Sequence, residues 1–564
     1  MCGIVGYTGP REAGPILIEG LKRLEYRGYD SAGIALVDDA GDLFVEKRAG
    51  KLANLQTAIA DRTPHAAIGL AHTRWATHGR PNDLNAHPHQ DCTGDITVIH
   101  NGIVENFREL RDGLEARGHT LTSETDTEAF AHLIEEAYAG DLADAVRQTL
   151  RQVHGAYALA VMHRGEPDRL VGARMDVPLV VGVAAGETFL ASDVAAILAH
   201  TDQVIFLEEG DVADLRPSGV TISGIDGLPR ERAVSTIDWT PEAAEKGGYE
   251  HFMLKEMYEQ PTALLQAITG RVTTDDRIEV AELAELGDVL RTVDRVELVA
   301  CGTAYYASLV GAAAIQDWVG IPARANIGSE FRYSPPPLDE RTLVIAVTQS
   351  GETADTIAPT RLARERGCPI IAVTNTVGSA ITREAKAVLF LQAGPEIAVA
   401  ASKTFVTQVT TLVILAAALA KARGRLGVEQ ELELGAALRR LPKQAQAALD
   451  ASGDVPDLAR RYVNSRGFMF VGRGYTYPAA LEGALKLKEV SYVHAEGYAA
   501  GELKHGPISL LDPEVPLVAV ATRSSVYDKL MSNVMEGRAR DARVIAVATE
   551  GDVGIERFAD EVLW

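Results

Sequence analysis

The chain has 564 residues, of which 46% are hydrophobic and 24% charged, and this composition excludes a disordered or collagen-like chain. It carries 55 Lys and Arg against 78 Asp and Glu, a formal net charge of −23. An acidic surface repels nucleic-acid phosphates and anionic lipids, so we expect neither nucleic acid nor a membrane as partner. The length predicts about four domain-sized units.

The cysteines and the first residues give further expectations. The four cysteines lie far apart without a C-x-x-C pair, which predicts neither a disulfide framework nor a metal site. The start, M-C-G-I-V-G, lacks the basic and apolar segments of a secretory signal. The best membrane candidate, residues 412–420, is shorter than the ~20 residues that span a bilayer. We therefore expect a cytoplasmic protein.

Residues 1 to about 215 alternate short Val- and Ile-rich runs, such as 95–100 and 156–162, with turns and a few helical stretches. This pattern predicts a largely antiparallel α+β domain. From 216 to about 248 the chain is rich in Gly, Pro and charge, which indicates a linker. We place the first domain at residues 1–240.

After the linker, the sequence predicts strand–turn–helix units of doubly wound parallel sheets, and it repeats. Adding 172 to seven positions between 299 and 312 gives the same residue type each time. An offset of 174 aligns 343–350 with 517–524. Two α/β domains of one fold are therefore expected, joined by a helical connector. The predicted bounds are 249–425, 426–460 for the connector, and 461–564.

Cys2 is the first candidate for chemistry. Removal of the initiator Met would leave an α-amine, with an ordinary pKa of ~8, on the residue that carries the thiol. Such an amine can act as the base for its own nucleophile. A second-position Cys alone is weak support, but dense polar segments follow it in an otherwise apolar domain. These segments are 26–33, 72–79, 85–89 and 123–128.

Other residues in this domain suit the same chemistry. After a strand, the Asn101 amide and the Gly102 N–H can together hold an oxyanion. An Arg and an Asp from separate loops can clamp the carboxylate and ammonium groups of a free amino acid. Each segment alone could be structural, but together they favour a catalytic site.

The order of these segments, with H-T-R-W-A-T-H-G and S-E-T-D-T-E, resembles an N-terminal-nucleophile (Ntn) glutamine amidotransferase. It closely resembles the glutaminase half of the glutamine–fructose-6-phosphate aminotransferase (glucosamine-6-phosphate synthase) family. The resemblance implies Cys2 as nucleophile, Asn101 and Gly102 as oxyanion hole, and Trp75 as the gate of an ammonia path. The residues implied to bind glutamine are Arg27, Arg74, Thr77, His78, His87 and Asp126.

In the second half, T-Q-S-G-E-T at 348–353 follows an apolar strand and begins a helix. Hydroxyls and N–H groups at a helix N-terminus suit a phosphate. Residues 301–303 form the matching turn after the first strand. No G-x-G-x-x-G follows either strand, so no dinucleotide or other cofactor is expected. Glu482 and Lys486, four residues apart on a helix, are by default a solvent-exposed ion pair.

The resemblance to the same family extends to its sugar isomerase (SIS) half. It is carried by the helical segment with Glu482 and Lys486 and by A-A-G-E-L-K-H-G-P at 499–507. The resemblance implies fructose 6-phosphate as substrate and Glu489 as the group that moves a proton between C1 and C2. It places Lys486 near the reacting carbons, and His505 in the sugar site of the neighbouring subunit of a homodimer, where it assists ring opening. The residues implied to bind the sugar phosphate are Gly302, Thr303, Thr348, Gln349, Ser350, Thr353 and Val399.

The sequence departs from the family pattern in places. Ala304 and Thr348 stand where many relatives carry Ser. The family's C-terminal tail, whose Lys forms a Schiff base with the open-chain sugar, has no counterpart before Trp564. The second SIS domain is therefore expected to be truncated. A chain ending there should hydrolyse glutamine but make little glucosamine 6-phosphate.

The expected fold is thus an α+β Ntn glutaminase domain followed by two α/β SIS domains. The expected reaction converts fructose 6-phosphate and L-glutamine into glucosamine 6-phosphate and L-glutamate, the first step of amino-sugar biosynthesis. An amidophosphoribosyltransferase would need a strand ending in paired acids in the C-terminal half, and an asparagine synthetase an S-G-G-x-D-S loop; both are missing. A non-enzymatic sugar-phosphate sensor would explain paired SIS domains but would have no use for Cys2 beside Arg74 and Asp126.

Overall fold

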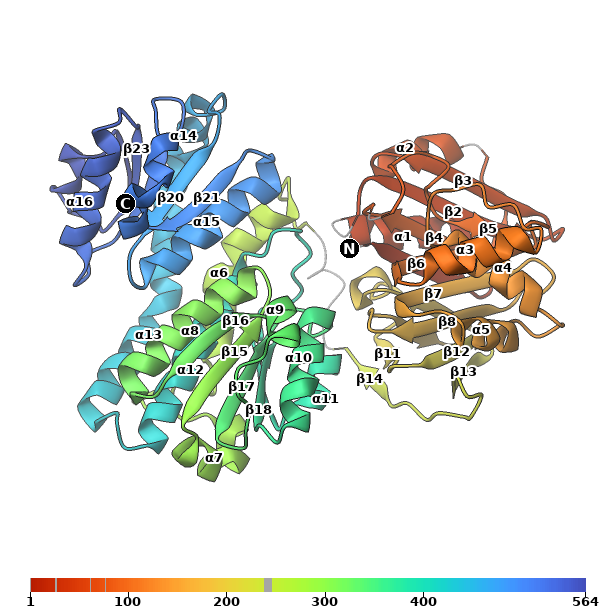
Figure 1. The fold of residues 1–564 in the computed structure, drawn as a ribbon, viewed down its shortest axis with the longest axis horizontal. Helices are drawn as coiled ribbons and strands as arrows, with labels where there is room; N and C mark the ends of the chain where they lie inside the picture. Colours follow the sequence, from red (N-terminus) through yellow and green to blue (C-terminus); the bar gives the residue numbers. More distant parts are fainter. Residues whose placement is uncertain (1, 26–27, 61, 77, 238–245) are drawn as a thin grey trace. The chain divides into compact units, whose positions relative to one another are not determined.

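The computed structural model describes residues 2–25, 28–60, 62–76, 78–237 and 246–564. The chain divides into two compact units, residues 1–247 and 248–564, and each is described by itself. Figure 1 shows the secondary structure of both units.

The first unit contains two antiparallel sheets. The eight-stranded sheet has the order β14 (Val234–Thr236), β11 (Gln203–Phe206), β9 (Val180–Ala184), β10 (Glu187–Ala191), β1 (Gly3–Thr8), β4 (Ala66–Arg74), β2 (Ser31–Asp38) and β3 (Leu43–Ala49). The six-stranded sheet has the order β13 (Gly219–Gly224), β12 (Asp211–Arg216), β8 (Leu170–Met175), β7 (Gly155–His163), β6 (Ile96–Val104) and β5 (His89–Gln90).

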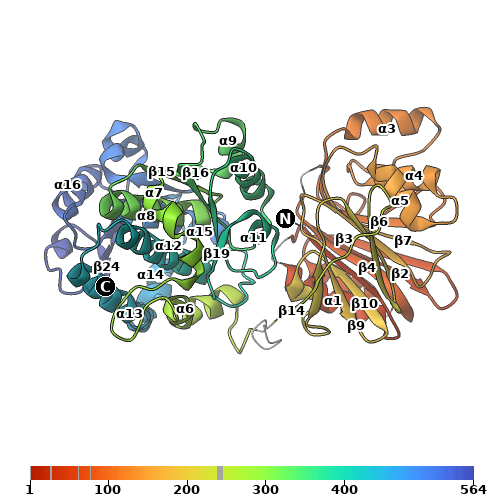
Figure 2. The same cartoon turned by 90° about the horizontal axis from the view of Figure 1, so that it is seen from below.

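Helices cover the outer faces of the two sheets. The helices of this unit are α1 (Ala13–Leu24), α2 (Leu52–Ile59), α3 (Phe107–Ala116), α4 (Glu128–Ala137) and α5 (Leu142–Leu150). Helix α1 packs on β1 and β4, whereas α4 packs on β6 and α5 on β12. Figure 2 shows α1 on one side of this unit and α4 and α5 on the other. An aliphatic core that includes Ile4, Leu70 and Ile99 fills the space between the sheets. The predicted antiparallel α+β domain is confirmed in this four-layered arrangement.

Part of the stretch predicted as a linker forms strands. Strand β13 pairs with β12, and β14 pairs with β11. The apolar residues of β13, Val220 and Ile222, alternate along the strand and pack against the core between the sheets. The sequence did not predict this strand because the neighbouring turns, rich in Gly and charged residues, obscure its alternation of apolar and polar residues.

The second unit contains two parallel five-stranded sheets of one topology. The first has the order β16 (Ala323–Ile327), β15 (Arg295–Ala300), β17 (Thr342–Val347), β18 (Ile370–Thr374) and β19 (Ala387–Phe390). The second has the order β21 (Ala495–Ala499), β20 (Phe468–Gly472), β22 (Leu517–Ala521), β23 (Val544–Ala548) and β24 (Glu561–Leu563). Strand β21 repeats β16 after 172 residues and β23 repeats β18 after 174, so the predicted repeat is confirmed.

The helices of this unit follow the same repeat. They are α6 (Phe252–Ile268), α7 (Gly287–Thr292), α8 (Thr303–Val319), α9 (Gly328–Tyr333), α10 (Ala354–Glu365), α11 (Ala380–Glu384), α12 (Lys403–Ala422), α13 (Val428–Asp450), α14 (Val455–Arg461), α15 (Thr476–Ser491) and α16 (Tyr527–Arg538). Helix α15 is the counterpart of α8, and α16 that of α10. Helices α13 and α14 lie between the two sheets in the sequence, where a helical connector was predicted.

Helix α12 is long and apolar enough to cross a membrane, with a mean hydropathy of 1.7. It packs against α8 and α6, and its residues Leu412, Leu415 and Leu419 are fully buried in the core of the first sheet. Burial inside a folded domain therefore accounts for its hydropathy. The predicted apolar run 412–420 is the C-terminal half of this helix.

The strand order positions a ligand site. The chain leaves β15 toward β16 on one side of it, and later returns to β17 on the other side. In such sheets the connections diverge between these two strands, which leaves a crevice at their carboxyl ends. Residues 301–303 and 348–353 follow these two ends directly.

Candidate active sites

The thiol of Cys2 lies beside the end of β4. Cys2 directly precedes β1, and the backbone N–H of Trp75 donates to Cys2 Sγ at 3.2 Å. The thiol donates to the Trp75 carbonyl at 3.5 Å. Burial raises the pKa of the Cys2 thiol above its ordinary value, although the contact with Trp75 opposes this. The resting thiol is therefore protonated, and a base is needed to make it a nucleophile.

Asn101 on β6 is held against Cys2 in a fixed orientation. Its Nδ2 donates to the Cys2 carbonyl at 2.9 Å, and its Oδ1 lies 2.9 Å from His72 Nε2. Burial lowers the pKa of His72 to about 3, so the ring is neutral and its Nε2–H donates to Asn101. The amide N–H₂ of Asn101 is thereby directed toward Cys2. Sequence analysis did not assign His72 this positioning role.

Gly102 has a backbone conformation that requires glycine. Its φ is +130°, and a Cβ at this position would lie 1.9 Å from the Ala156 carbonyl oxygen on β7. Gly102 therefore follows Asn101 with its backbone close to the neighbouring strand. An amide side chain and a backbone N–H in succession are hydrogen-bond donors of the kind that oxyanion holes use.

Arg74 and Asp126 supply opposite charges to the same region. Arg74 donates to the carbonyls of His78 and Gly79, the latter at 3.3 Å, and acts electrostatically on Cys2 and Asp126. Its buried Nη1 has no hydrogen-bond partner among the described residues. Asp126 accepts from the Val104 N–H at 2.9 Å. A guanidinium with an unused donor and a carboxylate match the two charged groups of an amino acid.

The remaining residues predicted for this site lie in different surroundings. His78 is half-buried, with its ring edge against Phe107. His87 is buried and stacks on His72 with ring centroids 4.2 Å apart, so it supports that histidine from behind. The Trp75 side chain is 41% exposed and lies edge-on to Tyr29. Arg27 and Thr77 lie outside the described residues.

The histidines beneath Asn101 predict acid sensitivity of the first unit. Burial lowers the pKa of His72 to about 3, and that of His87 and His89 well below the ordinary value. As the pH falls, the unfolded chain therefore protonates these histidines at a higher pH than the folded chain does. The free energy of unfolding decreases as the pH drops from ~6.5 toward 3, by up to ~1.4 kcal/mol per pH unit for each histidine.

Chemical denaturation of the first unit at neutral and mildly acidic pH measures this effect. The His87→Gln variant should show a shallower pH dependence than the parent, because one titrating group is removed. A denaturation midpoint that does not change with pH over the range in which free histidine titrates would contradict the expectation.

In the second unit, two charged residues of α15 contact the start of α8, and a third pairs with one of them. Thr303 Oγ1 donates to Glu482 at 3.0 Å and accepts from Lys486 Nζ at 3.1 Å. Lys486 Nζ also lies 2.6 Å from Glu489 and 3.3 Å from Glu482. Glu482 is only 5% exposed, and burial raises its pKa. The expectation of a solvent-exposed Glu482–Lys486 pair is therefore wrong, because the turn of α8 covers it.

The loop after β17 is ordered by its own hydroxyls. Thr348 Oγ1 accepts from the Gly351 N–H at 3.3 Å, and Ser350 Oγ accepts from the Glu352 N–H at 3.2 Å. Thr353 Oγ1 lies 3.5 Å from Thr348 Oγ1. Two glycines permit the turns: Gly302 has φ +56°, and Gly351 has φ +70°. The backbone carbonyl of Gln349 accepts from Asn375 N.

Two further predicted residues of this half, Val399 and His505, are exposed. Val399 is 56% exposed in the loop before α12, and Glu256 holds this loop by accepting from the Ile397 and Ala398 N–H groups. His505 ends a 3₁₀ turn and is exposed, and no described hydrogen bond joins it to Glu489. Among the described residues of one chain, a hydrogen bond and an ion pair join Thr303, Lys486 and Glu489, and neither of these contacts includes His505.

Comparisons with known proteins define the class of these sites. Residues 72–199 match the family profile of a glutamine amidotransferase domain, and residues 289–418 and 462–564 match that of the SIS domain. The chain therefore combines a glutamine amidotransferase with paired SIS domains.

Individual relatives narrow this class. The glutamine–fructose-6-phosphate aminotransferases (isomerizing) of Thermus thermophilus and Symbiobacterium thermophilum are each 49% identical to it over the whole chain, which spans 92% and 93% of their lengths. The C-terminal domain of glucosamine-fructose-6-phosphate aminotransferase from Francisella tularensis matches at a TM-score of 0.54 and 33% identity, over 57% of this chain and 90% of that one. The chain belongs to the glutamine–fructose-6-phosphate aminotransferase family, as its motifs predicted.

Proposed function

We propose that the protein transfers the amide nitrogen of L-glutamine to fructose 6-phosphate and isomerises the product to glucosamine 6-phosphate, with release of L-glutamate. One observation carries this proposal: the Cys2 thiol and the Asn101 amide converge at the N-terminus of a chain that also holds the Thr303–Lys486–Glu489 group. The sequence similarity over the whole chain supports the same reaction.

Hydrolysis of glutamine begins at Cys2. Its Sγ attacks the side-chain carbonyl carbon, and its proton passes to the α-amine that removal of Met1 exposes. Asn101 Nδ2 and the Gly102 N–H stabilise the oxyanion of the tetrahedral intermediate. Collapse of this intermediate releases ammonia and leaves a thioester, which water hydrolyses to glutamate.

Charged groups orient glutamine in its pocket, and Trp75 controls the exit of ammonia. The unused Nη1 of Arg74 binds the α-carboxylate of glutamine, and Asp126 binds its α-ammonium group. Arg27, Thr77, His78 and His87 complete or support this pocket. The exposed Trp75, whose backbone contacts Cys2, gates the path of ammonia toward the sugar.

The sugar phosphate binds at the carboxyl ends of β15 and β17. Hydroxyl and N–H groups of Thr348, Gln349, Ser350 and Thr353 hold the phosphate, while Gly302, Thr303 and Val399 line the sugar. Glu489 takes the proton from C1 and returns it at C2. The ammonium group of Lys486 lies 2.6 Å from Glu489 and holds that carboxylate in position.

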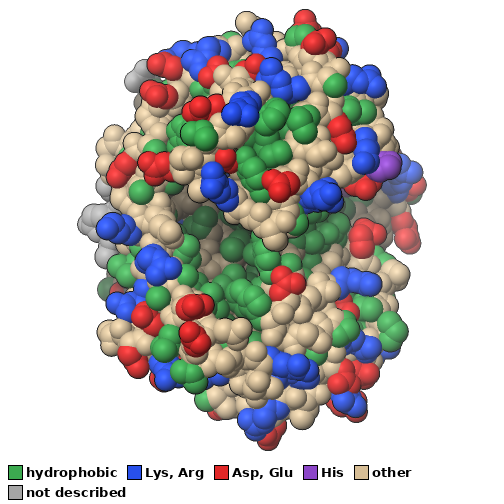
Figure 3. All heavy atoms as spheres, turned by 90° about the vertical axis from the view of Figure 1, so that its left-hand side faces the viewer, with side chains coloured by type: hydrophobic (Ala, Val, Ile, Leu, Met, Phe, Trp, Pro, Cys, Tyr) green, Lys and Arg blue, Asp and Glu red, His purple; other side chains and the backbone are tan. Residues whose placement is uncertain are grey.

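The exposed His505 reaches the sugar site of a second copy and assists ring opening there. A homodimer is supported by exposed apolar side chains in the second unit, among them Val463 and Tyr492, each 72% exposed. Figure 3 shows hydrophobic side chains gathered around a hollow on one face. We place this enzyme in the cytoplasm, with domain bounds at 1–240, 249–425 and 461–564.

The phosphate site predicts the effect of a double substitution. Thr348→Val with Ser350→Ala should weaken binding of fructose 6-phosphate at least ~10-fold in calorimetry, since a hydrogen bond to a charged group contributes about 1.5–3 kcal/mol. Thr292→Val with Ser334→Ala, which changes exposed side chains elsewhere in the same unit, is the matched control. Equal affinity in the two double variants would place the phosphate elsewhere.

A direct assay separates this function from that of a sugar-phosphate sensor. An enzyme of the proposed kind releases ammonia from glutamine with stoichiometric glutamate, whereas a sensor binds the sugar phosphate and leaves glutamine intact. Absence of glutamine turnover, despite binding of fructose 6-phosphate, would favour the sensor.

A further inference from the structure

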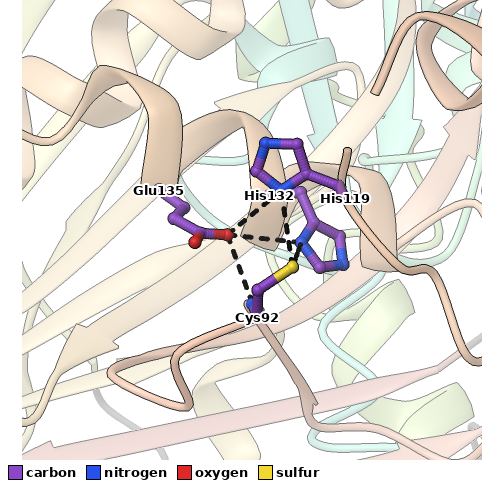
Figure 4. A group of neighbouring side chains, drawn as sticks. All are labelled: Cys92, His119, His132 and Glu135. Atoms are coloured by element: carbon purple, nitrogen blue, oxygen red, sulfur yellow. Dashed lines mark hydrogen bonds and ion pairs between the residues drawn. The ribbon is translucent and has the colours of Figure 1, made fainter. Parts of the chain in front are cut away.

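Four side chains that the proposed reaction does not use converge on α4 (Figure 4). Cys92 lies just after β5, His119 just after α3, and His132 and Glu135 lie three residues apart on α4. One ligand atom from each residue lies within 4.8 Å of the corresponding atoms of the other three. The sequence predicted no metal site here, because three separate segments contribute and only one cysteine is present.

The spacing of the four ligand atoms fits a tetrahedral ion. Bonds of Zn²⁺ to sulfur, nitrogen and oxygen imply distances of about 3.3–3.6 Å between neighbouring ligand atoms of a tetrahedron. Cys92 Sγ lies 3.5 Å from His119 Nδ1 and 3.4 Å from His132 Nδ1. Glu135 Oε2 lies 3.3 Å and 3.4 Å from the same two nitrogens. These four of the six pairwise distances agree with the tetrahedral value, and the other two lie within 4.8 Å.

A second layer of contacts orients these ligands. His119 Nε2 lies 3.1 Å from Glu136 Oε1, and His132 Nε2 lies 3.9 Å from Glu128 Oε1. The Cys92 N–H donates to Glu135 Oε2 at 3.2 Å. Histidines that bind a metal through one ring nitrogen typically donate a hydrogen bond to a carboxylate through the other, as the position of His119 beside Glu136 allows.

We propose that Cys92, His119, His132 and Glu135 form a Zn²⁺ site. A thiolate and a carboxylate balance the charge of the ion, and the thiol with two imidazoles disfavours Mg²⁺ and Ca²⁺. Four protein ligands leave no position for a substrate, so the site is structural. It joins the turn after β5 to α4, and α4 begins two residues after Asp126.

Metal titration of the whole protein tests the site. After removal of metal with a chelator, wild-type protein should bind one equivalent of Zn²⁺ by competition with a chromophoric chelator and by elemental analysis. Co²⁺ should give a thiolate-to-metal absorption band and the intense visible bands of four-coordinate Co²⁺. Cys92→Ser should abolish the thiolate band and weaken Zn²⁺ binding more than ~100-fold, whereas Glu136→Gln should weaken it about 10-fold.

Two controls keep the test specific. Cys368→Ser, which changes a buried thiol outside the cluster, should bind Zn²⁺ as the wild type does. Cys2 with its α-amine is itself a possible Zn²⁺ ligand, so Cys2→Ala must also retain the site. In wild-type protein, Zn²⁺ should protect the exposed Cys92 from alkylation, as peptide mass spectrometry can measure. This readout does not depend on the folding of any variant.

Two results would overturn the proposal. One is the absence of stoichiometric Zn²⁺ binding together with unprotected Cys92. The other is binding that persists in Cys92→Ser or that disappears in Cys2→Ala. Neither outcome bears on glutamine hydrolysis, which is measured separately.

Discussion

Replacing Cys2 by alanine should abolish glutamine hydrolysis, with a loss on the order of 10⁴-fold or more in kcat, as expected when a catalytic nucleophile is removed. The Asn101 amide and Gly102 N–H remain in place in this variant, but no thioester can form. Glutamate release, followed with and without fructose 6-phosphate, measures the loss. Binding of the sugar phosphate to the other unit should be unchanged.

The matched control for this substitution is Cys368→Ser. This thiol is buried in the second unit and donates to the Asp339 carbonyl at 3.2 Å, a contact that a serine hydroxyl can replace. Its glutaminase activity should stay within a few-fold of wild type. Undiminished glutamate formation by Cys2→Ala would show that another group is the nucleophile.

Glu489→Gln should stop proton transfer on the sugar while leaving glutamine hydrolysis and sugar binding in place. The amide is isosteric with the carboxylate but cannot accept the C1 proton, and general-base catalysis contributes about 10²–10⁴-fold. The expected loss in sugar isomerisation has this size. Transfer of deuterium from C1 of deuterated fructose 6-phosphate to C2 of the product, followed by NMR, measures the step directly.

Glu496→Gln serves as the control for that variant. Glu496 also pairs with a lysine, at 3.4 Å from Lys488, but it lies on β21, and no hydrogen bond or ion pair among the described residues joins it to Thr303 or Lys486. Its transfer of deuterium from C1 to C2 should match wild type. Normal isomerisation by Glu489→Gln would remove Glu489 from the proposed mechanism.

The fold and the class of the protein could be predicted from the sequence wherever residue spacing or the order of motifs determines them. Residues such as Gly302 and Gly474 recur at a fixed offset, and this repeat predicted two sheets of one topology. Similarly, the order of Cys2, the segment after His72, and Asn101 was enough to predict the class of the first unit. These patterns are local, or repeat along the chain, and need no knowledge of packing.

Features that depend on packing between distant segments could not be predicted. Glu482 looked like one half of an exposed i,i+4 pair until α8 was seen to cover it. The neutral state of His72 results from complete burial among other histidines, and its contact with Asn101 spans 29 residues of sequence. The cluster around His132 likewise draws its ligands from three separate segments.

The transfer of nitrogen from one site to the other is the central claim, and isotope labelling tests it most directly. The protein expressed from its complete gene is supplied with amide-¹⁵N-glutamine and fructose 6-phosphate in a buffer rich in unlabelled ammonium. The account predicts that glucosamine 6-phosphate carries ¹⁵N from glutamine and that glutamate forms in equal amount. Glutamate formed without labelled amino sugar, or amino sugar carrying the unlabelled nitrogen of the buffer, would contradict it.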